Sequence, residues 1–247
     1  MDAHRDVDVA LRRRLAMKRP QDTTFDETLR GPKMFAGRIW VIDPLDGGKN
    51  FIRGVPVWAT LIALMVDGVP TVGVVSAPAL HRRWWAAAGD GACATRWTEP
   101  ARRLSVSAIE DLGAASLCFS SLSGWGVLGL RERFIVLADD VWRARGYGDF
   151  YSYCLVAEGV ADIALAAQVS VRQLAAVDIL IHEAGGTFTD LGGSRDRTAR
   201  PSQQPMAHYT MRSLAASPAP QPCIRRCEHC GGVGRTFAAI DVRSVHR

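Results

Sequence analysis

Two aspartates lie three residues apart in the stretch VIDPLDGGKNF, and a pair of glycines follows the second aspartate. Asp43 and Asp46 supply carboxylate oxygens, the ligands that hard cations such as Mg²⁺ prefer. Gly47 and Gly48 leave backbone amides open at a turn or helix start, where such amides bind phosphate. This short stretch therefore has the chemistry to hold a divalent cation beside the phosphate group on which it acts.

The same residue types also form ordinary turns, because Asp, Pro and Gly are common turn residues. The alternative is that residues 43–48 are a structural turn without a ligand. The apolar run 38–42 before them is β-branched and aromatic, which predicts a buried strand. Pro44 cannot continue a central ladder, so the strand is expected to end at Asp43 and to leave both carboxylates at its carboxyl end.

The rest of the chain contains both helical and extended patterns. Asp67-Gly68 between two β-rich runs is a hairpin signal. The apolar spacing predicts helices over residues 6–17, 128–140, 151–158 and 174–183. Strands are expected over residues 58–66, 71–76, 83–88, 104–107, 115–120, 161–165 and 187–191.

Composition and charge narrow the class of protein. The 247 residues are 48% hydrophobic and 22% charged, which is an ordinary globular composition. No apolar stretch is long enough for a transmembrane helix, and the first fifteen residues lack the apolar segment of a signal peptide, so a cytoplasmic location is expected. The net charge of +5 comes from the Arg-rich stretch after residue 193. The remaining body offers no basic face, so neither nucleic acid nor a membrane is the expected partner.

The whole motif resembles the Asp-Pro-[Ile/Leu]-Asp-Gly-Thr-x-Asn-Phe signature of the inositol monophosphatase family of Mg²⁺-dependent phosphatases. The likeness runs to Gly193 through stretches such as NFIRGVPVWATLIALM, YGDFYSYCLVAEG and QVSVRQLAAVDILIHEAGG. It is greatest to the actinobacterial type that acts on histidinol phosphate. The resemblance implies a layered α/β/α/β/α fold that is incomplete at both ends, a homodimer, and bound Mg²⁺. It further implies hydrolysis of a phosphate monoester, L-histidinol phosphate to L-histidinol in histidine biosynthesis.

The family's functional positions carry over onto this chain one by one. The resemblance implies that Glu27, Asp43 and Asp46 are the catalytic carboxylates and metal ligands. The backbone carbonyl of Leu45 would complete the first metal site, and the amides of Gly47 and Gly48 would face the phosphate.

Four positions depart from the family pattern. Gly48 stands where the family has a Thr that orients the attacking water, and His4 replaces an aspartate near the third metal. Gln173 replaces the aspartate that binds the second metal, and Arg172 replaces the preceding Trp. Gln173 can offer a second metal only a neutral carbonyl oxygen. The sequence therefore predicts weak occupancy of the second metal site and reduced turnover.

Two further residues are candidates for substrate binding. Asp149 could meet the cationic amine of histidinol, and the alternative is that it caps the helix predicted from residue 151. Arg53 lies just beyond the motif and could contact substrate or a dimer partner, and the alternative is an ordinary surface arginine.

The character of the sequence changes after Gly193. Residues 1–193 are expected to form the phosphatase domain, and residues 194–247 a disordered basic tail rich in Pro, Ser and Arg. The tail contains Cys223, Cys227 and Cys230, which could bind zinc or an iron–sulfur cluster, or could reflect a shifted reading frame. Three alternatives stay open: a phosphatase for inositol 1-phosphate or another small monoester, a non-catalytic relic, and a protein that acts through its tail.

Overall fold

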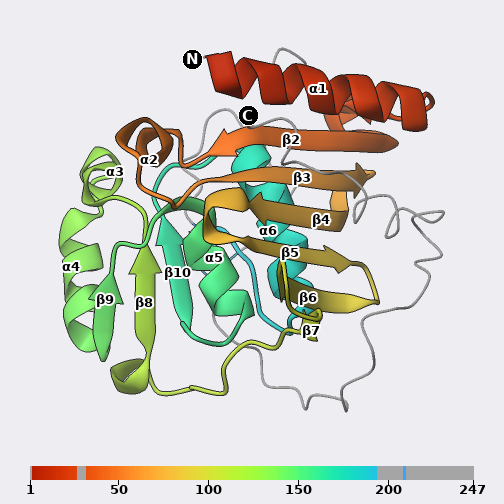
Figure 1. Cartoon of the computed structure of the whole chain (residues 1–247). Helices are drawn as coiled ribbons and strands as arrows, with labels where there is room; N and C mark the ends of the chain where they lie inside the picture. Colours follow the sequence, from red (N-terminus) through yellow and green to blue (C-terminus); the bar gives the residue numbers. More distant parts are fainter. Residues whose placement is uncertain (1, 27–31, 194–207, 210–247) are drawn as a thin grey trace.

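Two β-sheets alternate with three helical layers in the computed structural model, which describes residues 2–26, 32–193, 208 and 209 (Figure 1). The large sheet has seven strands in sequence order and the small sheet has four in the order β11-β10-β8-β9. The large sheet contains β1 (Thr23–Thr24), β2 (Arg38–Asp46), β3 (Ala59–Val66), β4 (Val69–Ala77), β5 (Arg82–Ala87), β6 (Gly91–Arg96) and β7 (Arg102–Arg103). The small sheet contains β8 (Ser116–Phe119), β9 (Arg143–Arg145), β10 (Ile163–Ala166) and β11 (His208–Tyr209).

The helices cover both faces of each sheet, as the resemblance implied. α1 (Asp2–Lys18) packs on one face of the large sheet, and α5 (Asp149–Ala157) and α6 (Val171–Glu183) lie between the two sheets (Figure 1). α3 (Leu122–Val127) and α4 (Arg131–Asp140) cover the outer face of the small sheet, and α2 (Gly48–Arg53) follows β2. Three 3₁₀ turns complete the described elements, at Pro32–Phe35, Pro78–Leu80 and Leu112–Ala114. The predicted layered α/β fold is confirmed.

Alternating side chains of β2 build the cores on both faces of the large sheet. Trp40 and Ile42 pack with the buried residues of α1, whereas Ile39 and Val41 pack toward α5 and α6. Successive side chains of a strand point to opposite faces, so one buried strand serves two layers. This double burial fixes β2 between α1 on one face of the sheet and α5 and α6 on the other.

Strand β2 runs beyond the predicted strand of residues 38–42, through Pro44 to Asp46. The pairing with β3 is regular up to Asp43 and resumes at Asp46, with a shift of register between them. Pro44 lies in this irregular step, where the missing N–H costs no ladder bond. The expected stop at Asp43 was wrong because the ladder skips the proline and then continues.

Other differences from the predicted elements have local causes. Residues 104–107 form no strand, because the N–H of Val106 donates to the carbonyl of Ala184 at the end of α6. Within residues 187–191 only Thr189 forms a bridge, and no strand is present. β6 and α3 were missed because GACATR and LSGWGV are rich in small residues, which are weak strand and helix formers. The predicted hairpin is confirmed, with Asp67 and Gly68 at positive φ between β3 and β4.

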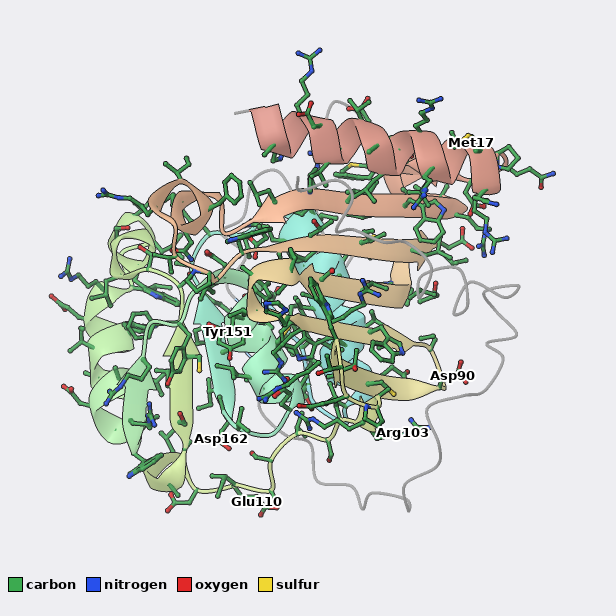
Figure 2. The ribbon with its side chains drawn as sticks, in the orientation of Figure 1. Met17, Asp90, Arg103, Glu110, Tyr151 and Asp162 are labelled. Carbon is green, nitrogen blue, oxygen red and sulfur yellow. The ribbon has the colours of Figure 1, made fainter. Side chains whose placement is uncertain are left out.

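Polar contacts fasten the edges of the two sheets. Figure 2 labels Arg103 and Asp90 at the β5–β7 edge of the large sheet, where Nη1 of Arg103 donates to the carbonyl of Asp90 at 2.6 Å. Asp162, labelled near the small sheet, accepts from the N–H of Ser116 at 2.6 Å and from the hydroxyl of Ser107. Among the described helices, none has the length and apolar character needed to cross a membrane.

A buried carboxylate joins the large sheet to α5. Glu158 pairs with Arg82 and Arg102, and the indole N–H of Trp84 donates to the same carboxylate. We expect Glu158→Gln to lower the free energy of unfolding by about 3–5 kcal/mol, because it leaves the buried guanidinium of Arg82 without its counter-charge.

A matched control separates this effect from the loss of any ion pair. Arg102 shares the same carboxylate, but its side chain is 55% exposed. We expect Arg102→Gln to lower the free energy of unfolding by about 1 kcal/mol or less. Urea titration measures the free energy of unfolding of both variants. Equal costs for the two variants would show that burial of the Arg82–Glu158 pair is not what stabilises this contact.

Candidate active site

Two buried carboxylates stand at the carboxyl end of β2, near the N-terminal end of α1 (Figure 1). Oδ1 of Asp43 accepts a hydrogen bond from the N–H of Leu45 at 3.1 Å. The irregular step at Pro44 allows Asp43 and Asp46 to belong to one local cluster although they lie three residues apart. The sequence correctly placed both carboxylates at the end of a strand.

Asp46 is the point where β2, α5 and α6 meet. Its Oδ2 accepts from the N–H of Phe150 at 2.7 Å, and its Oδ1 accepts from Nε2 of Gln173 at 3.1 Å. Both carboxylate oxygens thus receive a protein donor, which fixes the orientation of the side chain. Each oxygen keeps a second lone pair for a cation or a water.

Burial is the main cause of the raised pKa values in this carboxylate cluster. Burial raises the pKa of Asp46 to about 7, and the charges of Asp43 and Asp149 add to that rise. Burial also raises the pKa of Asp43, whereas the N–H of Leu45, His4 and Arg172 act to lower it. Such mutual repulsion in a buried place is what a bound cation relieves.

Gln173 reaches this cluster as a hydrogen-bond donor. Its Oε1 accepts from the N–H of Ser170 at 2.9 Å, and its Nε2 then points to Asp46. The N–H of Ser170 can only donate, so it fixes which end of the amide faces the carboxylate. The carbonyl oxygen that was expected to face a metal is turned to the backbone at the start of α6.

Gly47 and Gly48 differ in whether a side chain could be added at their positions. Gly47 has φ +79°, and a Cβ there would lie 2.6 Å from the carbonyl oxygen of Val57 and 3.4 Å from Oδ2 of Asp149. Gly48 is the first residue of α2, and a Cβ there would meet no atom within 4 Å. Only Gly47 is therefore required by the local structure.

These two positions provide a matched pair of substitutions. We expect Gly47→Ala to destabilise the protein by about 1–3 kcal/mol and to disrupt the loop, because its φ is left-handed and its Cβ would clash with backbone. Gly48→Ala is expected to leave the melting temperature unchanged or slightly higher. Differential scanning fluorimetry of both variants checks this, and equal losses would contradict it.

Asp149 lies against the glycine loop. It is the first residue of α5 and has φ +43°, a left-handed conformation that is uncommon outside glycine. Gly148, not Asp149, is the N-cap residue, so the alternative of a capping role is not supported. Burial raises the pKa of Asp149, and Lys49 acts to lower it. A backbone outlier beside a carboxylate cluster suggests a functional position.

The remaining sequence candidates are not all joined to this cluster. Arg53 is exposed in the last turn of α2 and makes no ion pair with the described residues. Glu27 and the cysteines Cys223, Cys227 and Cys230 lie outside the described residues, as does nearly all of the stretch 194–247. The predicted boundary at residue 193 stays a prediction.

Besides Phe150, sequence reasoning missed Tyr153 beside the site. The hydroxyl of Tyr153 on α5 is buried and has no hydrogen-bond partner in the described part of the chain. Burial raises its pKa, and the charges of Asp46 and Asp149 raise it further, so the hydroxyl lies near both carboxylates. Nothing in the sequence distinguishes Tyr153 from an ordinary core tyrosine.

The donor set fits a hard cation only in part. Asp43 and Asp46 with the carbonyl of Leu45 offer oxygen ligands, and water commonly fills the other positions around Mg²⁺. Within the described ranges, however, no three His, Cys, Asp or Glu side chains are grouped so that they could hold a metal ion. The residues thus offer part of the ligand set of one cation, and the first turn of α6 adds no carboxylate to the two aspartates.

This combination of fold and acidic glycine loop defines a class of phosphatase. Residues 1–224 match the inositol monophosphatase family, and the chain belongs to that family. The inositol monophosphatase from Anabaena has the same fold, with a TM-score of 0.74 at 24% identity over 85% of this chain and 81% of that one.

Two bacterial histidinol-phosphatases are similar to this chain over most of its length. The chain is 60% identical over 192 residues to a histidinol-phosphatase of Mycobacterium tuberculosis, covering 78% of this chain and 74% of the relative. It is 47% identical over 196 residues to a histidinol-phosphatase of Streptomyces coelicolor, covering 78% and 73%. The predicted family and the class of phosphomonoesterase are confirmed.

Proposed function

We propose that this protein is a Mg²⁺-dependent phosphomonoesterase that hydrolyses L-histidinol phosphate to L-histidinol. The observation that carries the proposal is the buried pair Asp43 and Asp46 at the end of β2, next to the open amides of the glycine loop. The high identity to two histidinol-phosphatases supports the choice of substrate.

Each residue of the site has a definite task in this reaction. Asp43, Asp46 and the carbonyl of Leu45 would hold Mg²⁺ with Glu27, and the bound ion would supply an acidified water and polarise the phosphoryl group. The amides of Gly47 and Gly48 would receive the phosphate oxygens. The hydrogen bonds from Phe150 and Gln173 keep Asp46 in one orientation before substrate arrives. Because Gly48 has no hydroxyl, the attacking water lacks one orienting partner, and turnover is expected to be low.

Asp149 is proposed to select the substrate. Its carboxylate is adjacent to Gly47, where the phosphate would bind, and burial raises its pKa. A cationic amine next to Asp149 would offset that unfavourable burial of charge, whereas the uncharged ring of inositol would not. Arg53 is exposed, and we propose that it contacts the substrate or a dimer partner.

The experiment compares kcat/KM for histidinol phosphate and inositol 1-phosphate in wild type and Asp149→Asn. The wild type is expected to prefer histidinol phosphate, and Asp149→Asn is expected to reduce that preference about tenfold, which corresponds to roughly 1.4 kcal/mol. A preference for inositol 1-phosphate would contradict the proposed substrate. An unchanged ratio in the variant would contradict the role of Asp149.

A second candidate is a non-catalytic relic of the same family. The orientation of Gln173 and the absence of a hydroxyl at Gly48 favour it. A homodimer and a cytoplasmic location stay predictions from the resemblance and from the first fifteen residues.

A further inference from the structure

Thr60 is the one polar side chain of β3, and it lies opposite the irregular step of β2 between the two aspartates. Asp43 pairs with Leu61 and Asp46 pairs with Ala59, so two residues of β2 face Thr60 alone. Such an extra residue is a β-bulge, which bends a strand and re-aims its side chains. The contacts that hold this bulge therefore bear on the direction of the carboxylates at its ends.

The hydroxyl of Thr60 and the carboxylate of Asp43 hold the two ends of one peptide group. Thr60 is buried, and its Oγ1 donates to the carbonyl oxygen of Pro44 at 2.9 Å. The N–H of Leu45 donates to Oδ1 of Asp43 at 3.1 Å. The carbonyl of Pro44 and the N–H of Leu45 belong to the same planar peptide group, so they cannot turn independently of each other. The bond from Thr60 therefore also fixes the direction of the N–H that Asp43 accepts.

We propose that Thr60 is a positioning residue for Asp43: its hydroxyl locks the peptide between Pro44 and Leu45, and that peptide holds the carboxylate at the proposed cation site. Without the hydroxyl, the carbonyl of Pro44 would lose a hydrogen bond in a buried place, and the peptide would be less firmly held. Groups that orient a metal ligand from behind typically change metal affinity about 10–100-fold. The part of this inference that concerns a cation rests on the proposed function, whereas the hold on the peptide does not.

The first test measures exchange of the Leu45 amide proton in the metal-free protein by NMR. Thr60→Val keeps the β-branched shape but removes the donor, and it is expected to speed this exchange about tenfold. Thr60→Ala, a second variant without the donor, should behave in the same way. Thr60→Ser keeps the hydroxyl and should stay within about threefold of the wild type. Unchanged exchange in the variants without the donor, or an equal increase in Thr60→Ser, would overturn the hold on the peptide.

Thr71 provides a matched control in the same sheet. It lies on β4 at the register shift between β3 and β4, and its hydroxyl donates to the carbonyl of Leu64 at 3.1 Å. Thr71→Val therefore removes the same kind of hydrogen bond toward the other end of β3. We expect Thr71→Val to leave both the exchange at Leu45 and the affinity for Mn²⁺ unchanged. If Thr71→Val changed them as much as Thr60→Val, a general loosening of the sheet would be the cause, and the inference would fall.

The second test measures the affinity for Mn²⁺ by calorimetry, without substrate. Thr60→Val is expected to raise the Kd about tenfold, and Thr60→Ser about threefold or less. If the role of Thr60 were merely structural, Thr60→Val would lower the melting temperature and leave the Kd of the folded protein unchanged. That result would overturn the positioning role.

The two readouts also separate this inference from the proposed function. Faster exchange at Leu45 in Thr60→Val, in a chain that hydrolyses no phosphate ester, would retain the hold on the peptide and reject the phosphatase. Mg²⁺-dependent hydrolysis by the wild type, with exchange and Mn²⁺ affinity unchanged in Thr60→Val, would retain the phosphatase and reject the inference.

Discussion

Asp46→Asn is expected to reduce Mg²⁺-dependent phosphate release by roughly 100-fold or more. Loss of groups that only support a metal ligand already costs about 10–100-fold, and Asp46 is proposed as a direct ligand. Asn also offers a single acceptor oxygen, whereas Asp46 accepts from both Phe150 and Gln173. One of these donors would then face the NH₂ group of Asn, at a cost of about 1–3 kcal/mol in stability.

Because the variant also loses stability, its activity is to be measured per folded molecule. Circular dichroism and a urea titration give the folded fraction under assay conditions. Asp140→Asn, at the exposed end of α4, is the matched control and is expected to keep the activity of the wild type. Full activity of a folded Asp46→Asn protein would reject the assignment of Asp46 to the site.

The double variant Gly48→Thr/Gln173→Asp is expected to raise turnover of histidinol phosphate about 10–100-fold. The Thr hydroxyl would orient the attacking water, and the new carboxylate would add a ligand beside Asp46. The structure has room for the Thr, since a Cβ at Gly48 meets no atom within 4 Å. Asp at position 173 also suits the positive end of the helix dipole at the start of α6.

A control for the added side chain is Gly126→Thr on α3, where a Cβ likewise meets no atom within 4 Å. This variant is expected to leave turnover unchanged. Initial rates at saturating Mg²⁺ and substrate decide the comparison. If the double variant folds as well as the wild type and gains nothing, the departures at Gly48 and Gln173 do not limit the reaction.

The strand and hairpin that carry the site were predictable, because both have signals in the local sequence. The apolar run before Asp43 indicated a buried strand, and Asp67-Gly68 indicated the hairpin that follows. The stop at Asp43 was wrong because a shifted register lets β2 pass Pro44, and this depends on pairing with β3. The pattern of residues in β2 alone does not show how β2 is aligned with its neighbour β3.

The details of the site depended on contacts between distant segments. Phe150 and Gln173 lie more than 100 residues from Asp46, and nothing in their local sequence indicates that both donate to it. The direction of the Gln173 amide follows from the donor at Ser170, which is visible only once α6 is placed. The buried hydroxyl of Tyr153 beside the carboxylates was missed for the same reason.

The most direct test of the central claim is phosphate release from histidinol phosphate by the unmodified protein as Mg²⁺ is increased from zero. The proposal that Asp43 and Asp46 form a metal-dependent phosphatase site expects release that rises with Mg²⁺, saturates, and disappears with a chelator. No release from a folded protein at any Mg²⁺ concentration, or release that persists unchanged in the chelator, would contradict it.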